Sequence, residues 1–169
     1  MNVFFALILS LLVMPTNDYT VLSDQAQIGF TIKNAGFTVD GKMTDLKGNI
    51  SFNSADMSSS KISLSVAVNT IDTGNKTRDK HLRAEDYFDV ETYPRITFTS
   101  TGISKAANGY LVKGRFQIKE TTKEVEIPFT FSQNVFKGEF SINRVDYGVG
   151  KKSWILDKTV TISFSIPVQ

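Results

Sequence analysis

The amino-acid sequence predicts an all-β domain, an eight-stranded antiparallel up-and-down barrel with a short helical cap segment. Two observations carry this prediction. Apolar and polar residues alternate with a period of two in eight separate runs, which is typical of strands with one buried and one exposed face. Dipeptides typical of tight hairpins also occur along the chain, and closing such strands into a barrel removes exposed sheet edges.

The eight runs follow one another from Gln27 to the end of the chain. In the first, QIGFTIK at 27–33, the apolar residues Ile28, Phe30 and Ile32 share one face. The same alternation recurs at 49–53, 61–70, 95–100, 110–119, 124–132, 139–143 and 159–168. Hairpin turns are predicted at three dipeptides, Asp40-Gly41, Asn108-Gly109 and Lys137-Gly138.

One segment, between Gly74 and Val90, lacks the alternation. Either Asn75 or Thr77 could cap the first turn of a helix there, and charged residues stand four positions apart. We therefore expect a short helix that caps one end of the barrel. The expected ion pairs within it are Asp79 with Arg83 and His81 with Glu85.

Composition limits the classes of function. The 169 residues suffice for one domain, and the net charge of +2 comes from interspersed charges, which argues against nucleic acid as a partner. The absence of cysteine excludes disulfides and thiol chemistry. A single histidine among scattered carboxylates does not have the spacing of a metal site, so neither a metal nor a cofactor is expected.

The N-terminal residues 1–18 differ from the rest. Val3 to Met14 form an apolar run that is short for a bilayer span and ends at Pro15. We interpret 1–18 as a signal peptide, which predicts a periplasmic or secreted protein whose barrel domain spans 19–169. A first core strand and a membrane anchor are the alternatives.

The predicted inward face is rich in phenylalanine, and it suits a hydrocarbon ligand because each buried methylene contributes about 0.8 kcal/mol. The same side chains could instead fill the barrel, so both interiors stay open at this point. The residues that we expect to line an apolar cavity are Phe30, Phe52, Val66, Phe98, Val112, Phe116, Phe129, Phe131, Phe140 and Phe164.

The cap segment and its surroundings could supply chemistry at the mouth. His81 with Asp79 or Glu85 could form an acid–base set, but residues two apart on a helix diverge, so no catalytic residue is predicted. Arg78 and Arg144 could receive a phosphate group, although pairing with Asp79, Asp146 or Glu139 is favoured. The residues expected at the mouth or cap are Arg78, Asp79, His81, Leu82, Tyr87, Phe88 and Arg144.

Several stretches resemble a known family. IDTGNKTRDKHLRAEDYFDVETYPRITFTS at 71–100, YLVKGRFQIKETTKEVEIPFTF at 110–131 and FSINRVDYGVG at 140–150 are similar to the YceI-like family, as is NAGFTVDGKMTDLKGNISFN at 34–53. The resemblance implies a lipocalin-like barrel that holds a long polyisoprenoid, such as a polyprenyl pyrophosphate or a quinone tail, usually in exported bacterial proteins.

The expected function is therefore that of an exported protein that binds a polyisoprenoid for sequestration or transport. The expected partner is a long-chain isoprenoid or another lipid, and transient contact with a membrane is compatible with that role. Two alternatives remain: an enzyme acting on such a lipid with His81 as acid or base, and a solid barrel serving as an interaction scaffold. The sequence gives no indication of the oligomeric state.

Overall fold

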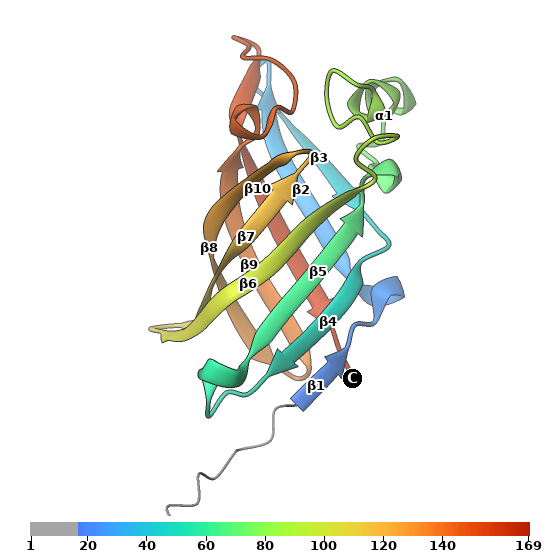
Figure 1. Cartoon of the computed structure of the whole chain (residues 1–169). Helices are drawn as coiled ribbons and strands as arrows, with labels where there is room; N and C mark the ends of the chain where they lie inside the picture. Colours follow the sequence, from blue (N-terminus) through green and yellow to red (C-terminus); the bar gives the residue numbers. More distant parts are fainter. Residues whose placement is uncertain (1–16) are drawn as a thin grey trace, which may run out of the picture.

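The computed structural model of the chain describes residues 17–169, which form one curled antiparallel sheet with ten strands (Figure 1). Residues 1–16 of the predicted signal peptide lie outside the described residues. The strands are β1 (Asn17–Thr20), β2 (Gln27–Asn34), β3 (Phe37–Met43), β4 (Lys47–Phe52), β5 (Lys61–Ala67), β6 (Arg95–Ala106), β7 (Gly109–Ile118), β8 (Thr121–Ser132), β9 (Val135–Asn143) and β10 (Leu156–Pro167).

The sheet curls into a barrel. At one end of it, β1 and the residue that follows join the β4 side of the sheet to the end of β10. The strand order is β1-β4-β5-β6-β7-β8-β9-β10-β2-β3, and every pairing is antiparallel. β1 pairs with β4, and Val21 just beyond it bridges Val168 after β10. Among the strands of the described chain, β3 has only β2 as a partner, and the bridge from Lys42 to Asp72 ties it to the segment after β5.

The antiparallel barrel predicted from the sequence is confirmed as a fold class, but two strands were missed and two turns were placed wrongly. Asp40-Gly41 and Lys137-Gly138 lie inside β3 and β9. The chain reverses instead at Ala35-Gly36 and Gln133-Asn134, where all four residues have positive φ, as a type I′ hairpin requires. The hairpin predicted at Asn108-Gly109 is present, but its turn lies one residue earlier, at Ala107-Asn108, because Gly109 is already the first residue of β7 and pairs with Ala106.

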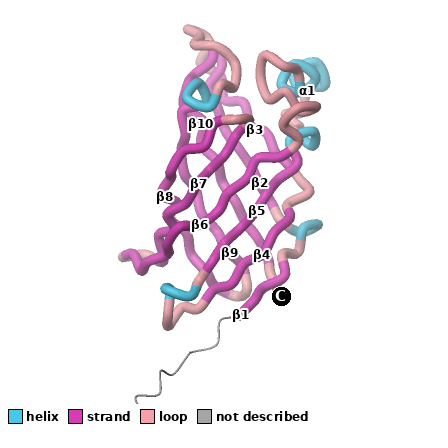
Figure 2. Tube along the Cα trace, in the orientation of Figure 1, coloured by secondary structure: helices cyan, strands magenta, loops and turns pink. Residues whose placement is uncertain are grey.

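Within the described residues, helical structure is confined to the ends of the barrel (Figure 2). The predicted cap helix is present as α1 (Lys76–Arg83), and Asn75 caps it by accepting a hydrogen bond from the Arg78 N–H. Four short 3₁₀ turns complete the set: η1 (Ser23–Gln25), η2 (Met57–Ser59), η3 (Val68–Thr70) and η4 (Arg144–Tyr147). Within residues 17–169, no helix is long and apolar enough to cross a membrane.

Period-two alternation places the core as expected. Along β7, Val112, Phe116 and Ile118 are buried, whereas Lys113, Arg115 and Gln117 point outward and are exposed. The same alternation in the other strands directs their apolar side chains to the inside of the barrel.

Candidate functional site

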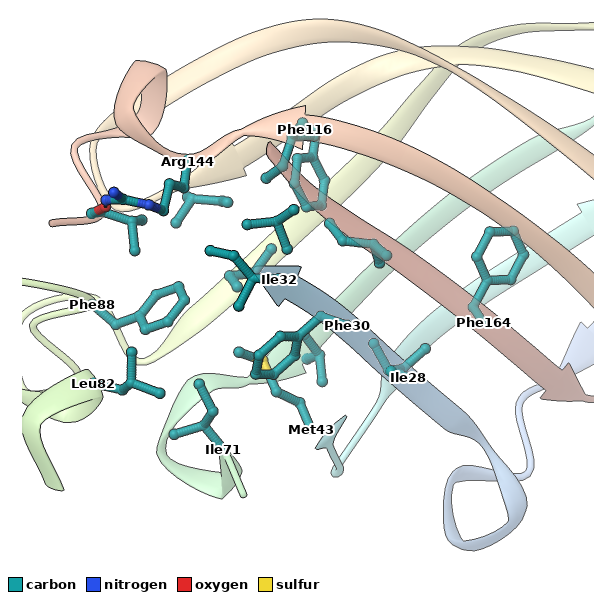
Figure 3. A pocket seen from close by; sticks show the side chains of 18 of the residues that line it. Ile28, Phe30, Ile32, Met43, Ile71, Leu82, Phe88, Phe116, Arg144 and Phe164 are labelled. Atoms are coloured by element: carbon teal, nitrogen blue, oxygen red, sulfur yellow. The ribbon is translucent and has the colours of Figure 1, made fainter. Parts of the chain in front are cut away.

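The inside of the barrel contains an apolar cavity of about 630 Å³. This volume lies within the range of about 300–1,000 Å³ that is typical of small-molecule sites. Strands from all around the barrel line it, including β2 with Ile28 and Phe30 and β10 with Ile162 and Phe164 (Figure 3). The interior is therefore hollow, and the alternative of a barrel filled by its own side chains is wrong.

Exposure along β2 and β10 identifies the unfilled part of the interior. Ile28, Ile32, Ile162 and Phe164 all line the cavity, yet none of them is fully buried. Ile50 in β4 also lines the cavity but is only 1% exposed, so the accessible surface lies on the β2 and β10 side. Apolar side chains that point inward and still retain accessible surface lack a partner on one side, which favours an apolar ligand there.

Glycines in three strands accommodate phenylalanine rings of the lining. Phe30 pairs directly with Gly41, and Phe164 pairs directly with Gly138. A Cβ atom added at either glycine would overlap the neighbouring ring, and the same holds for Gly114 beside Phe98 in β6. The rings therefore lie over the neighbouring strand along the barrel wall, in the space that a side chain would otherwise take.

Aromatic side chains close the end of the barrel where β1 lies. Phe52 contacts four other rings edge-on or nearly so, with centroid distances of 4.9 to 5.8 Å. Phe131 stacks on Phe136 at 4.3 Å. We call this cluster the aromatic floor; its members are Tyr19, Phe52, Tyr110, Phe129, Phe131 and Phe136.

Arg144 in η4 is a buried cation at the opposite end, and it also lines the cavity. Its guanidinium donates to the carbonyl oxygens of Val149, Lys151, Leu156 and Asp157 at 2.8 to 3.1 Å. No carboxylate pairs with it in the described part of the chain, so the expected pairing with Asp146 or Glu139 is wrong. Burial lowers the pKa of the guanidinium, which nevertheless stays charged at physiological pH.

The Asp79 carboxylate, which sequence reasoning considered and rejected as an acid–base partner of His81, is bound to Thr73 instead. The buried Asp79 carboxylate accepts hydrogen bonds from the Thr73 N–H and hydroxyl, and Arg78 donates to the same hydroxyl. Arg78 thus pairs with no acid within residues 17–169, contrary to the expectation. His81 lines the cavity mouth, whereas Asp79 does not.

Polar contacts hold the cap over one side of the mouth. Arg83, expected to pair with Asp79, instead donates to the carbonyls of Asn69 and Ile71 after β5. The Gly150 N–H donates to the Asp86 carbonyl, which joins the cap to the loop before β10. The cap is therefore bound to two neighbouring segments.

The structure brings most of the predicted residues together at the cavity, and it corrects a few. Phe52 and Phe131 belong to the aromatic floor instead of the lining, and Asp79 lies beneath the cap. The predicted residues that do line the cavity are Phe30, Val66, Phe98, Val112, Phe116, Phe129, Phe140, Phe164, Arg78, His81, Leu82, Tyr87, Phe88 and Arg144. Whether they contact a ligand stays a prediction.

Sequence reasoning missed other lining residues for identifiable reasons. The predicted apolar face included Ile28, Ile32 and Ile162. They were left out of the predicted cavity lining because that list was drawn up mainly from phenylalanines. Val39 and Met43 were missed because β3 was interpreted as a turn. Within the described residues, no group of three or more histidine, aspartate or glutamate side chains is arranged to hold a metal.

Comparison with known proteins identifies relatives of the chain. The family model described as YceI-like domain matches residues 19–168. A UPF0312 protein of Photorhabdus laumondii is 36% identical over 101 residues, which cover 59% of this chain and 53% of that protein. A UPF0312 protein of Yersinia enterocolitica is 35% identical over 103 residues, covering 60% and 54%. The matched stretch spans about half the length of these curated relatives.

Solved structures share the fold. The crystal structure of Burkholderia cenocepacia BcnA superposes with a TM-score of 0.82 at 26% identity, over 88% of this chain and 99% of that one. A polyisoprenoid binding domain from Saccharophagus degradans superposes with a TM-score of 0.63 at 14% identity, over 89% and 97%. At 14% identity the likeness establishes a common fold and no more.

Proposed function

This chain belongs to the YceI-like family, and on that premise we propose that it binds one long apolar lipid of the polyisoprenoid class inside its barrel. The observation that carries the proposal is the hollow apolar interior, whose lining on β2 and β10 keeps accessible surface. The name of the Saccharophagus degradans domain supports the class of ligand. Each methylene that enters contributes about 0.8 kcal/mol, so a few isoprene units offset the cost of ordering the chain.

We infer that the lipid enters tail first with its head group at the mouth. The aromatic floor blocks the other end of the barrel, whereas polar and cationic side chains gather at the mouth. Arg144 supplies a positive charge there that no carboxylate within residues 17–169 pairs with. Such a charge favours an anionic or strongly polar head group, such as a pyrophosphate or a quinone ring.

We further propose that the protein is exported and that it sequesters or transports its lipid between membranes. The apolar run from Val3 to Met14 supports export. Mass measurement of the protein isolated from its own host tests this step. We expect a chain that has lost its first residues, whereas a full-length chain in the cytoplasmic fraction would contradict export.

Native mass spectrometry of the protein from its own host tests the binding proposal. We expect a co-purified lipid that the substitution Ile162→Trp removes, because the indole would fill the cavity from β10. Ser163→Trp is the matched control, since Ser163 is the next residue of the same strand and is exposed. A protein without bound lipid that also takes up no added polyprenol would refute the proposal.

A further inference from the structure

The largest exposed apolar side chains of the described residues lie together at the mouth. Trp154 is fully exposed, and Phe37 and Ile155 are exposed to 76% and 63%. Phe37 begins β3, while the other two precede β10. Exposed aromatic and aliphatic side chains in one place mark an interaction surface more often than isolated ones do.

Backbone hydrogen bonding brings these two segments together. The Ala35 N–H in the β2–β3 turn donates to the Ile155 carbonyl at 2.8 Å. In the sheet, Leu156 is opposite Asn34, and Asn34 is opposite Phe37. Figure 1 shows the β2–β3 turn and the loop before β10 at the same end of the barrel as α1.

This surface continues into the cavity. Ser153, Ile155, Leu156 and Asn34 all line the cavity described above. Because Trp154 and Phe37 adjoin these residues, the exposed apolar surface forms part of the edge of the opening. A partner that binds to this exposed apolar surface would therefore face the entrance through which a lipid passes.

Exposed lysines flank the apolar side chains. Within 33–40 and 148–159 there are four lysines against two aspartates. The lysines are Lys33, Lys151, Lys152 and Lys158, and all four are exposed. We call this surface the β2–β10 rim; it comprises these lysines with Phe37, Trp154 and Ile155.

We propose that the β2–β10 rim docks on a membrane that contains anionic lipids, so that the cavity opens toward the bilayer. Tryptophan prefers the membrane–water interface, phenylalanine and isoleucine insert below it, and lysines are attracted by anionic head groups. The combination matches a lipid surface in both polarity and charge. The proposal rests on the proposed lipid-binding function, to which it adds the site of loading.

Trp154 is the only tryptophan of the chain and reports directly on docking. The probes are vesicles of phosphatidylcholine alone and of phosphatidylcholine mixed with phosphatidylglycerol. We expect the Trp154 emission to shift to the blue only with the mixed vesicles, and the shift to disappear at about 1 M salt, where charges are screened. An unchanged emission with both vesicles would overturn the proposal.

Variants assign the contact to the rim. Phe37→Ala with Ile155→Ser should lower partitioning at least about tenfold, because two large apolar side chains no longer insert. Lys151→Glu with Lys152→Glu should lower it by at least about fivefold for each lysine. Lys61→Glu with Lys105→Glu makes the same charge change at exposed sites in β5 and β6, away from the rim, and should have no effect. An equal loss in that control would contradict docking through the rim.

Failure of docking is distinguishable from failure of the proposed function. Ile162→Trp should lose the co-purified lipid and still bind vesicles, since the rim is intact. The rim variants should lose vesicle binding and still take up added polyprenol, because their cavity is intact. Analytical sedimentation distinguishes docking on a membrane from docking on a second copy of the chain. A wild-type dimer that dissociates in the variant Phe37→Ala with Ile155→Ser would assign the rim to a second copy and overturn membrane docking.

Discussion

At the scale of single residues, Arg144 organises the mouth by satisfying backbone carbonyls. Four carbonyls between Val149 and Asp157 turn inward and accept from one guanidinium. These groups lie in the loop that connects η4 to β10 and carries Trp154, and in the first two residues of β10. A buried carbonyl left without a donor costs about 1–3 kcal/mol, so the loop depends on this side chain for its shape.

Replacing Arg144 by methionine should lower the free energy of unfolding by about 3–5 kcal/mol, because several carbonyls would lose a charged donor at once. Urea denaturation measures this loss. Arg115→Met is the matched control, since Arg115 is exposed on the outside of β7. A loss for Arg144→Met no larger than that of the control would show that the loop holds its shape without the guanidinium.

Asp45, in the connection from β3 to β4, should make stability depend on acidity. The Arg95 guanidinium donates to its carboxylate at 2.8 Å, and this hydrogen bond holds the pKa of Asp45 below its ordinary value. A depressed folded-state pKa stabilises the protein above the unfolded-state value, and this stabilisation is lost as the pH falls through the folded-state value. The affected window lies below about pH 4.

Asp45→Asn should therefore lower the urea midpoint at about pH 7 and have a progressively smaller effect below about pH 4, where the wild type also loses the charge. The size will be modest, because the Asp45 side chain is 39% exposed. Glu91→Gln, at an exposed site, is the control. A constant difference between wild type and Asp45→Asn across this pH range would contradict a role for the charge.

At the scale of elements, the strands owe their inner surface to glycines as much as to phenylalanines. Gly41, Gly114 and Gly138 lack the Cβ that would displace a neighbouring ring. With the rings held along the wall, the centre of the barrel stays free. Glycine weakens a strand on its own, and cross-strand packing of an aromatic ring over it offsets that weakness.

Gly41→Ala should destabilise the protein by about 1–3 kcal/mol, since the methyl group would force the Phe30 ring out of its position. In a Phe30→Ala background the same substitution should cost less than about 1 kcal/mol, and a double-mutant cycle measures the coupling. Gly102→Ala in β6 is the control, because nothing lies within 4 Å of the added carbon. Additive effects of Gly41→Ala and Phe30→Ala would contradict the direct packing.

The elements also show which parts of the structure a sequence pattern predicts. Alternation identified eight strands and their inner faces, because side chains alternate sides in any strand. Asp40-Gly41 misled because aspartate followed by glycine is typical of hairpins, whereas here the glycine accommodates a ring. Gln133-Asn134 turns without glycine, with both residues at positive φ. The role of Gly41 depends on a ring in the neighbouring strand, and a pattern of adjacent residues carries no information about contacts between strands.

At the scale of the whole molecule, the barrel has two unlike ends. Rings of the aromatic floor close one end, and the cap with the β2–β10 rim surrounds the other. Alternation predicts which face of a strand is inside but not the depth at which a residue lies. For that reason Phe52 and Phe131 were grouped with Phe30, although they belong to the floor. The hydrogen-bond partners of Arg144 could not be predicted either. They are backbone carbonyls, which every residue has, so the sequence does not distinguish them.

Phe52→Ala tests the importance of the floor for the fold. Phe52 is 1% exposed and contacts four other rings, so its removal should cost about 3–5 kcal/mol of unfolding free energy. Phe37→Ala, in the exposed rim, should change stability by less than about 0.5 kcal/mol. Similar losses for the two variants, measured by urea denaturation, would contradict a packed floor.

Photo-crosslinking locates the lipid directly. A polyprenol that carries a diazirine along its tail, bound and irradiated, should label inner residues of β2 and β10, such as Ile28, Ile162 and Phe164. Unlabelled polyprenol should compete for this labelling, and Ile162→Trp should abolish it. Labels found mainly on outward residues such as Lys113 and Arg115, unaffected by Ile162→Trp, would contradict a lipid site inside the barrel.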